Sequence, residues 1–142
     1  MNNNFDNLGI DADILKGVYL YGFKEPSPIQ IKGIESINTG KDCILQSQSG
    51  TGKTATYLLG VFNKLKVNNK LQAIILTPTR ELATQVYNVA VSITKYSKLI
   101  LSLNIGGNND NYSIKNTNLV IGTLGRINHI LKNNNSSTCN LL

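Results

Sequence analysis

The sequence predicts an α/β fold in which a mostly parallel sheet is covered by helices. Short apolar runs alternate along the chain with longer stretches whose apolar residues recur at helical spacing. This alternation is typical of parallel strands that are linked by helices and buried on both faces. With 142 residues, of which 41% are hydrophobic, the chain has enough apolar material for one globular domain and too little for two.

Two helices are expected ahead of the first strand. Apolar residues at helical spacing in residues 10–18 precede Gly22, which suits the end of a helix. Ser27 and Pro28 fit the N-cap and the first turn of a second helix. The apolar stripe of that helix ends near Gly40.

Four short apolar runs are expected to form the strands, and they cover residues 43–45, 73–76, 99–103 and 119–121. Helical spacing follows three of these runs, in residues 57–65, in residues 82–93 and from residue 127 onward. The first run contains Cys43, which we expect to be a buried, reduced thiol. Cys139 is far from it in sequence, so the two cysteines lack the paired spacing of a zinc site or a disulfide framework.

The charge balance favours a polyanionic partner only weakly. The formal net charge is +6 and the isoelectric point is near 9.4, but the lysines are spread along the chain and form no dense run. The first residues do not resemble a signal peptide, and no apolar run is long enough to span a bilayer. We therefore expect an intracellular, cytoplasmic protein without membrane association. His129 is the one histidine, and we assign it no role.

The strongest local motif lies between the first apolar run and the helix after it, and it reads Ser47-Gln48-Ser49-Gly50-Thr51-Gly52-Lys53-Thr54. Its glycines allow successive backbone N–H groups to face one centre, where the start of the following helix adds positive potential. This arrangement predicts a phosphate-binding loop, in which Lys53 reaches the outer phosphates and the Thr54 hydroxyl binds magnesium. Ser47 stands where the pattern usually has glycine. The alternative is a Gly-Ser turn that happens to precede a lysine.

Upstream of this loop lies Gly22-Phe23-Lys24-Glu25-Pro26-Ser27-Pro28-Ile29-Gln30, which resembles the Q motif of the DEAD-box RNA helicases. Phe5 matches the isolated aromatic residue that precedes this motif. The chemistry fits adenine, because a Gln30 side chain can accept from N6 and donate to N7, and guanine cannot reproduce this match. Phe23 would offer a face to the base. Taken alone, Phe23 could equally be a core aromatic and Gln30 a solvated residue of a first helical turn.

Three further segments resemble the RNA-contacting motifs of the same family, and they are Pro78-Thr79-Arg80-Glu81-Leu82-Ala83, Gly106-Gly107 and Thr123-Leu124-Gly125-Arg126. Thr79 is expected to cap a helix, and the hydroxyl and guanidinium groups suit phosphates rather than bases. In the third segment Leu124 replaces the family's proline, which would have fixed the first turn. Each segment also has a purely structural alternative: a capped helix for the first, a tight turn for the second and a solvated Arg126 at a helix start for the third.

The resemblance extends from Phe5 to about Leu131 and is closest to the translation-initiation subgroup. It implies a RecA-like fold, with residues 1–40 as helices that carry the Q motif and residues 41–142 as a partial ATP-binding domain. It also implies ATP and magnesium as ligands, the phosphate backbone of single-stranded or duplex RNA as partner, and unwinding by ATP-driven domain closure in the whole enzyme. The sequence does not reveal which proteins, if any, are partners.

The sequence contains no Asp-Glu-Ala-Asp motif, which in this family follows the Thr123 segment and holds the magnesium. We expect the chain to end before that motif, with Leu141 and Leu142 beginning its strand. We also expect an incomplete sheet with exposed apolar edge surface, and no ATP turnover by these residues alone. Two alternatives stay open: a nucleotide-dependent RNA-binding module without hydrolysis, and a phosphate-loop enzyme of another class.

Overall fold

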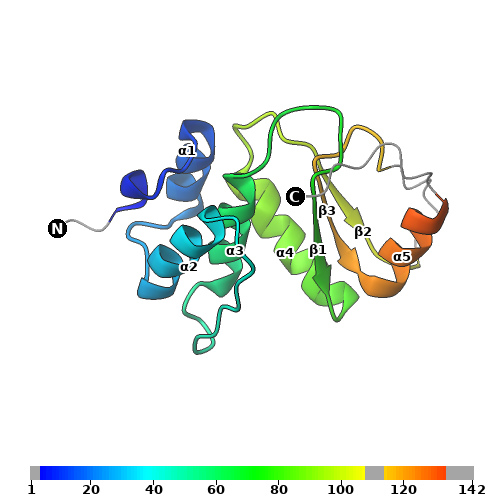
Figure 1. The fold of residues 1–142 in the computed structure, drawn as a ribbon, viewed down its shortest axis with the longest axis horizontal. Helices are drawn as coiled ribbons and strands as arrows, with labels where there is room; N and C mark the ends of the chain where they lie inside the picture. The colour runs from blue at the N-terminus through cyan, green and yellow to red at the C-terminus, as the bar shows by residue number, and fades with distance from the viewer. Residues whose placement is uncertain (1–3, 108–113, 134–142) are drawn as a thin grey trace. The chain divides into compact units, whose positions relative to one another are not determined.

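The computed structural model describes residues 4–107 and 114–133 (Figure 1). Cys139, Leu141 and Leu142 lie outside the described residues. The chain forms two compact units, of which the first comprises residues 1–64 with 92–97 and the second comprises residues 65–91 with 98–142. The separate helical segment 1–40 that the resemblance implies stays a prediction.

The first unit is helical. After the short 3-10 helix η1 (Phe5–Leu8), it contains α1 (Ala12–Tyr21), α2 (Pro28–Asn38) and α3 (Lys53–Phe62). The stop at Gly22 and the start at Pro28 are confirmed, because Gly22 adopts a left-handed φ of 112° and Ser27 is the N-cap of α2.

Small residues let α2 and α3 pack closely. A Cβ atom on Gly33 would lie 2.3 Å from the Thr56 methyl carbon, and one on Gly60 would lie 2.6 Å from Ile37 Cδ1. Since side chains at these two positions would force the helices apart, glycine sets their separation. The close contact fixes α3, and therefore the loop that precedes it, against α2.

The second unit holds a parallel sheet of three strands in the order β1-β3-β2, formed by β1 (Ala73–Thr77), β2 (Leu101–Asn104) and β3 (Leu119–Thr123). The register aligns Ala73 and Leu101 with Leu119, so all three strands begin at one edge of the sheet. The chain then continues from β1 into α4 (Arg80–Ile93) and from β3 into α5 (Leu124–Asn133). The α/β fold with parallel strands is therefore confirmed.

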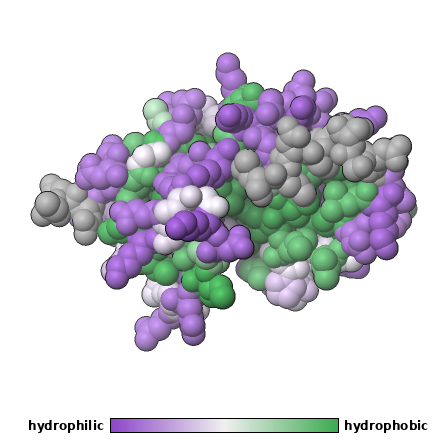
Figure 2. Space-filling model, in the orientation of Figure 1, coloured by the Kyte–Doolittle hydropathy of each residue, from purple (hydrophilic) through white to green (hydrophobic). Residues whose placement is uncertain are grey.

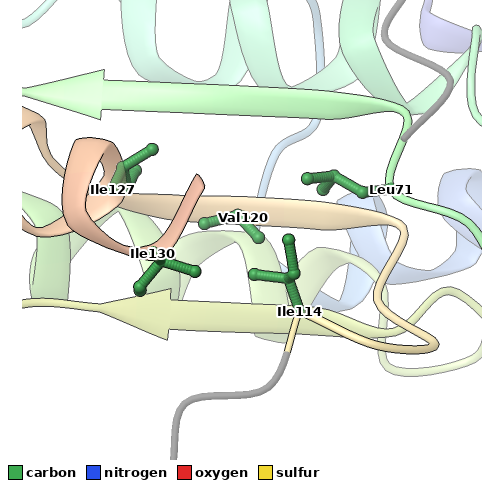
Figure 3. Packing of buried hydrophobic residues seen from close by; sticks show 5 residues of the cluster. All are labelled: Leu71, Ile114, Val120, Ile127 and Ile130. Atoms are coloured by element: carbon green, nitrogen blue, oxygen red, sulfur yellow. The ribbon is translucent and has the colours of Figure 1, made fainter. Parts of the chain in front are cut away.

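The core of this unit lies between β3 and α5. Ile127 and Ile130 of α5 pack with Val120, and Leu71 and Ile114 complete the cluster (Figure 3). On the opposite face of β3, Leu119 and Ile121 are also fully buried. Burial on both faces is what the apolar run 119–121 predicts.

The expected strand at residues 43–45 does not form, and Cys43 is exposed rather than buried. Ile44 is 95% exposed. A lone apolar run has no reason to be extended and buried unless a neighbouring strand accepts its backbone hydrogen bonds, and none of the described residues pairs with it.

Exposed apolar surface also remains on the sheet, as expected. Leu76 on the outer strand β1 is 52% exposed, and Figure 2 shows a hydrophobic area where the sheet lies in Figure 1. No helix among residues 4–107 and 114–133 has the length and apolar character required to cross a membrane.

Candidate functional site

The loop before α3 has the curled backbone that the glycine pattern predicts. Gly50 and Gly52 adopt left-handed φ angles of 77° and 94°. Gly52 is the N-cap of α3, so the helix begins at Lys53 and its first N–H groups face the loop. This arrangement creates the positive potential and the free amide donors that an anion needs.

Lys53 folds back over the loop. Its ammonium group donates to the backbone oxygen of Ser47 and, at 2.8 Å, to that of Gln48. The Thr51 hydroxyl donates to the Gln48 oxygen at 2.7 Å and contacts the Ser47 hydroxyl. The hydroxyl of Ser47 therefore takes part in closing the loop, and this serine preserves the turn that glycine usually makes.

The Q-motif segment contacts the same loop directly. The Ser27 hydroxyl donates to Thr51 O at 2.8 Å, and Gln30 Nε2 lies 3.5 Å from Gly52 O. A Cβ atom on Gly52 would lie 2.4 Å from Gln30 Nε2, so only glycine allows this approach. Gln30 is 3% exposed, which excludes the alternative of a solvated first-turn residue. The Q-motif segment and the loop are therefore in direct contact, although Gln30 and Gly52 are 22 residues apart.

Gln30 also caps α2, a role that the motif resemblance did not assign. Its Oε1 accepts from Ser27 N at 2.8 Å, which is one half of a capping box. The Ser-x-x-Gln spacing was the available signal in the sequence. One side chain therefore holds both the helix start and the phosphate loop.

Four aromatic rings cluster in this region, those of Phe5, Tyr19, Tyr21 and Phe23, and among them Phe5 alone is fully buried. Phe5 is fully buried and meets Phe23 edge-on, with ring centroids 6.1 Å apart. Since Phe5 presents no open face, it supports Phe23 rather than offering a surface itself. Tyr21 stacks on Phe23 at 5.3 Å. No sequence signal indicated this stack, which depends on the chain reversal at Gly22.

Thr54, the residue expected to bind magnesium, is half-buried in the first turn of α3. Its side chain hydrogen-bonds with Tyr57 one turn later. Burial raises the pKa of Tyr57 above its ordinary value, and this hydrogen bond works in the opposite direction. The i, i+3 spacing could have indicated the contact. Among the described residues, no group of three or more His, Cys, Asp or Glu could hold a metal ion.

The second unit contains an open pocket of about 350 Å³ at the end of the sheet where β3 passes into α5. It is lined by Arg80, Gly106, Thr123, Gly125, Arg126 and His129. The structure therefore brings together residues from all three predicted RNA-contacting segments. His129 also lines the pocket, although the sequence analysis assigned it no role. Its position one helical turn after Arg126 could have indicated this.

The double glycine makes room for the Arg80 guanidinium. A Cβ atom on Gly106 would lie 2.9 Å from Arg80 Nη2, and one on Gly107 would lie 3.1 Å from Nη1. Gly107 also has a φ of 101°. Because Gly106 and Gly107 have no side chains, the Arg80 guanidinium can lie close to their backbone.

The cap expected at Thr79 is confirmed, because its hydroxyl accepts from Leu82 N at 3.1 Å. Pro78 beside it is exposed. Helix α5 begins at Leu124, the residue that replaces the family's proline, and Leu124 is 66% exposed. The helix start therefore persists without the ring.

The comparisons with known proteins decide the family. The family described as DEAD/DEAH box helicase matches residues 27–142. The chain belongs to this family. An ATP-dependent RNA helicase FAL1 from Candida albicans is 40% identical over 99% of this chain, and an ATP-dependent RNA helicase eIF4A from Mycosarcoma maydis is 42% identical over 88%. Relatives with the eIF4A name confirm the subgroup resemblance.

A solved structure of this helicase family shows the same fold. Dbp5 from S. cerevisiae, bound to RNA and ADP BeF3, superposes with a TM-score of 0.85 at 33% identity over 92% of this chain and 34% of its own. This agreement confirms the RecA-like fold of the family. The chain spans 37% of the FAL1 relative and 32% of the eIF4A relative.

Proposed function

We propose that this chain is the ATP- and RNA-binding portion of an ATP-dependent RNA helicase. In the whole enzyme, ATP and RNA would draw two domains together, and this closure would separate an RNA duplex locally. Family membership and the names of the FAL1 and eIF4A relatives support the proposal.

The observation that carries it is the contact between the Q-motif segment and the phosphate loop. Ser27 and Gln30 reach the backbone of Thr51 and Gly52. A phosphate loop alone is compatible with many nucleotide-binding enzymes. Gln30 lies against that loop, so its side-chain amide would be available to the base of a nucleotide whose phosphates occupy the loop.

The amide of Gln30 retains hydrogen-bonding capacity for adenine. Oε1 accepts one bond from Ser27 N, and Nε2 makes one contact with Gly52 O. A side-chain amide oxygen can accept a second hydrogen bond, and its nitrogen can donate a second. One acceptor and one donor are what N6 and N7 of adenine require. Phe23 and, behind it, Phe5 would shape the base side of the site.

Lys53 would leave the carbonyls of Ser47 and Gln48 for the outer phosphates of ATP, while loop amides of residues 47–52 bind the others. Thr54 would supply one ligand of the magnesium ion that accompanies ATP, and Tyr57 would orient its hydroxyl. The ion itself supplies charge neutralisation at the phosphates.

The pocket of the second unit would bind RNA phosphates. Arg80 and Arg126 supply the charge and Thr123 a hydroxyl, and Gly106 and Gly125 leave room for a backbone. Next to these lining residues stand Pro78, Thr79 and Gly107, which complete the three segments. Because these groups recognise phosphate rather than base edges, binding would be independent of base sequence.

Equilibrium binding of labelled ATP tests the nucleotide site. We expect Lys53→Ala to lose ATP binding, because it removes the one cation inside the loop. Lys41→Ala, which removes an exposed lysine nearby in sequence, serves as the matched control and should bind as the wild type does. Equal ATP affinity in the wild type and in Lys53→Ala would contradict the proposal.

A further inference from the structure

The five lysines of the second unit gather at one edge of its sheet, although they are scattered in sequence. Lys66 and Lys70 lie in the segment before β1, Lys98 before β2 and Lys115 before β3. Lys132 follows Leu131, which lines a small apolar hollow together with Leu71 and Ile114. Since the strands are parallel and start in register, these segments meet at the amino-terminal edge. We call this set the lysine edge.

A buried side chain ties the lysine-bearing segments together. Asn118 is fully buried, and its Nδ2 donates to Asn68 O at 2.6 Å and approaches Lys66 O and Lys70 O at 3.4 Å. Its Oδ1 accepts from Ile100 N at 3.0 Å. These bonds hold the segments before β1 and β2 on the start of β3.

A second buried amide fixes the same segment. Gln72 is 4% exposed and makes a reciprocal pair with the backbone of Lys66, accepting from its N at 2.9 Å and donating to its O at 2.7 Å. The backbone positions of the lysines are therefore preorganised, while Lys66, Lys70 and Lys98 keep exposed side chains. Figure 2 shows mostly hydrophilic residues along the upper border, above the strand starts in Figure 1.

Charge is segregated between the two edges of this sheet. The two arginines, Arg80 and Arg126, line the pocket at the carboxyl-terminal edge. Glu81, the one acidic residue of this unit among the residues the structure describes, follows β1 and therefore also lies toward that edge. Within the second unit, therefore, no described carboxylate lies on the edge that carries Lys66, Lys70 and Lys98, which favours a polyanion.

We propose that the lysine edge is a second RNA-contacting surface, which binds phosphates of the strand beyond those held at the arginine pocket. The inference rests on RNA being the ligand of the proposed function. Strand β3 has five residues, so the two edges are separated by about 17 Å at about 3.3 Å per residue. A long single strand can follow the surface from one edge to the other, whereas an oligonucleotide of a few nucleotides centred on the pocket extends only about half its length toward the lysines and does not reach them.

Salt-dependent binding of oligouridines of about 4 and about 16 nucleotides tests the inference, because single-strand sites cover this range. The variant carries Lys66→Gln, Lys70→Gln and Lys98→Gln, which leave the backbone network intact. We expect it to reduce the slope of log affinity against log salt by about 2 for the long RNA, since each phosphate contact contributes about 0.7. Its slope for the short RNA should equal that of the wild type.

A control variant with Lys32→Gln, Lys41→Gln and Lys95→Gln makes the same change in net charge on exposed lysines of the first unit. It should keep the wild-type slope for the long RNA to within about one contact. An equal loss in both variants, or no loss in either, overturns the lysine edge. Loss of binding to phosphatidylserine vesicles without a change in RNA slope also overturns it, in favour of a membrane surface.

Arg126→Ala separates this inference from the proposed function. If Arg126→Ala lowers the slope for both RNAs while the Lys66, Lys70 and Lys98 variant changes neither, the arginine pocket stands and the lysine edge fails. If the lysine variant alone lowers the slope for the long RNA, the lysine edge stands and the pocket assignment fails. Absence of RNA binding by the wild-type chain overturns both.

Discussion

Gly122 and Gly125 lie three residues apart, yet the structure gives them opposite requirements. A Cβ atom on Gly122 would lie 2.0 Å from Asn104 O of the neighbouring strand, whereas one on Gly125 has nothing within 4 Å. We expect Gly122→Ala to lower the free energy of unfolding by about 1–3 kcal/mol through overpacking. Gly125→Ala should raise it by up to about 1 kcal/mol, because alanine favours the helix. Urea unfolding of both variants checks the pair, and equal effects would contradict the strand packing.

Tyr57 gives the stability of the first unit a dependence on alkaline pH. Burial raises the pKa of Tyr57 in the folded chain, so the folded state holds this proton more tightly than the unfolded state does. The associated stability is complete below the unfolded pKa of about 10 and is lost as the pH rises through the folded pKa. As the pH is raised above about 10, the free energy of unfolding should therefore fall less for Tyr57→Phe than for the wild type. Identical alkaline unfolding curves would show that Tyr57 is solvated.

At the scale of single helices, the Thr79 cap has a measurable contribution. Thr79→Ala removes the acceptor for Leu82 N and should lower the free energy of unfolding by about 1 kcal/mol. Thr84→Ala is the matched control, because the Thr84 hydroxyl only donates to the Arg80 oxygen within the same helix. It should be neutral or stabilising. Thermal melts of the two variants compare them directly, and a cap effect no larger than that of Thr84→Ala would be inconsistent with this geometry.

At residues 43–45 the sequence predicts a buried strand, and the structure has none. Because Ile44 is 95% exposed, Ile44→Lys should change the free energy of unfolding by less than about 0.5 kcal/mol. It should also reduce self-association, since an added charge discourages strand pairing. Unfolding experiments and light scattering measure the two effects. A large destabilisation would show that a buried strand forms here after all.

Elements whose signals are local were predicted well from the sequence, and those that depend on a distant partner were not. The Gly22 stop, the Ser27-Pro28 start and the Thr79 cap are each set by neighbouring residues, and the structure confirms them. The strand at 43–45 needed a neighbour to pair with, and its own pattern could not reveal whether one is present. Helix α5 begins three residues before its apolar spacing becomes evident.

The candidate site follows the same division. Motif spacing identified the residues that line the pocket of the second unit, apart from His129. It could not indicate that Gln30 is buried against Gly52, because that contact joins residues 22 positions apart. Nor could the spread of lysines in sequence show that five of them meet at one edge, which depends on the parallel register.

At the scale of the whole molecule, we expect the 142-residue chain to bind ATP without hydrolysing it above background. Lys53 and Thr54 can hold phosphates and one side of the metal, but the sequence contains no Asp-Glu-Ala-Asp motif. Phosphoryl transfer depends on positioning and charge stabilisation, and loss of one arginine finger alone costs about 10³–10⁵ in rate. Phosphate release in the presence of RNA and magnesium measures the rate of ATP hydrolysis. RNA-stimulated release that disappears in Lys53→Ala would show a complete active site.

We propose that one site in the first unit combines a phosphate loop with a glutamine that reads adenine. Competition between ATP and GTP for the wild-type chain, for Gln30→Ala and for Ser27→Ala tests it most directly. We predict a preference for ATP that Gln30→Ala abolishes, at about 1–3 kcal/mol. Ser27→Ala removes the bond to Thr51 O and should weaken both nucleotides alike. If the wild type binds GTP as tightly as ATP, or if Gln30→Ala weakens both equally, Gln30 is only a helix cap and the adenine assignment is wrong.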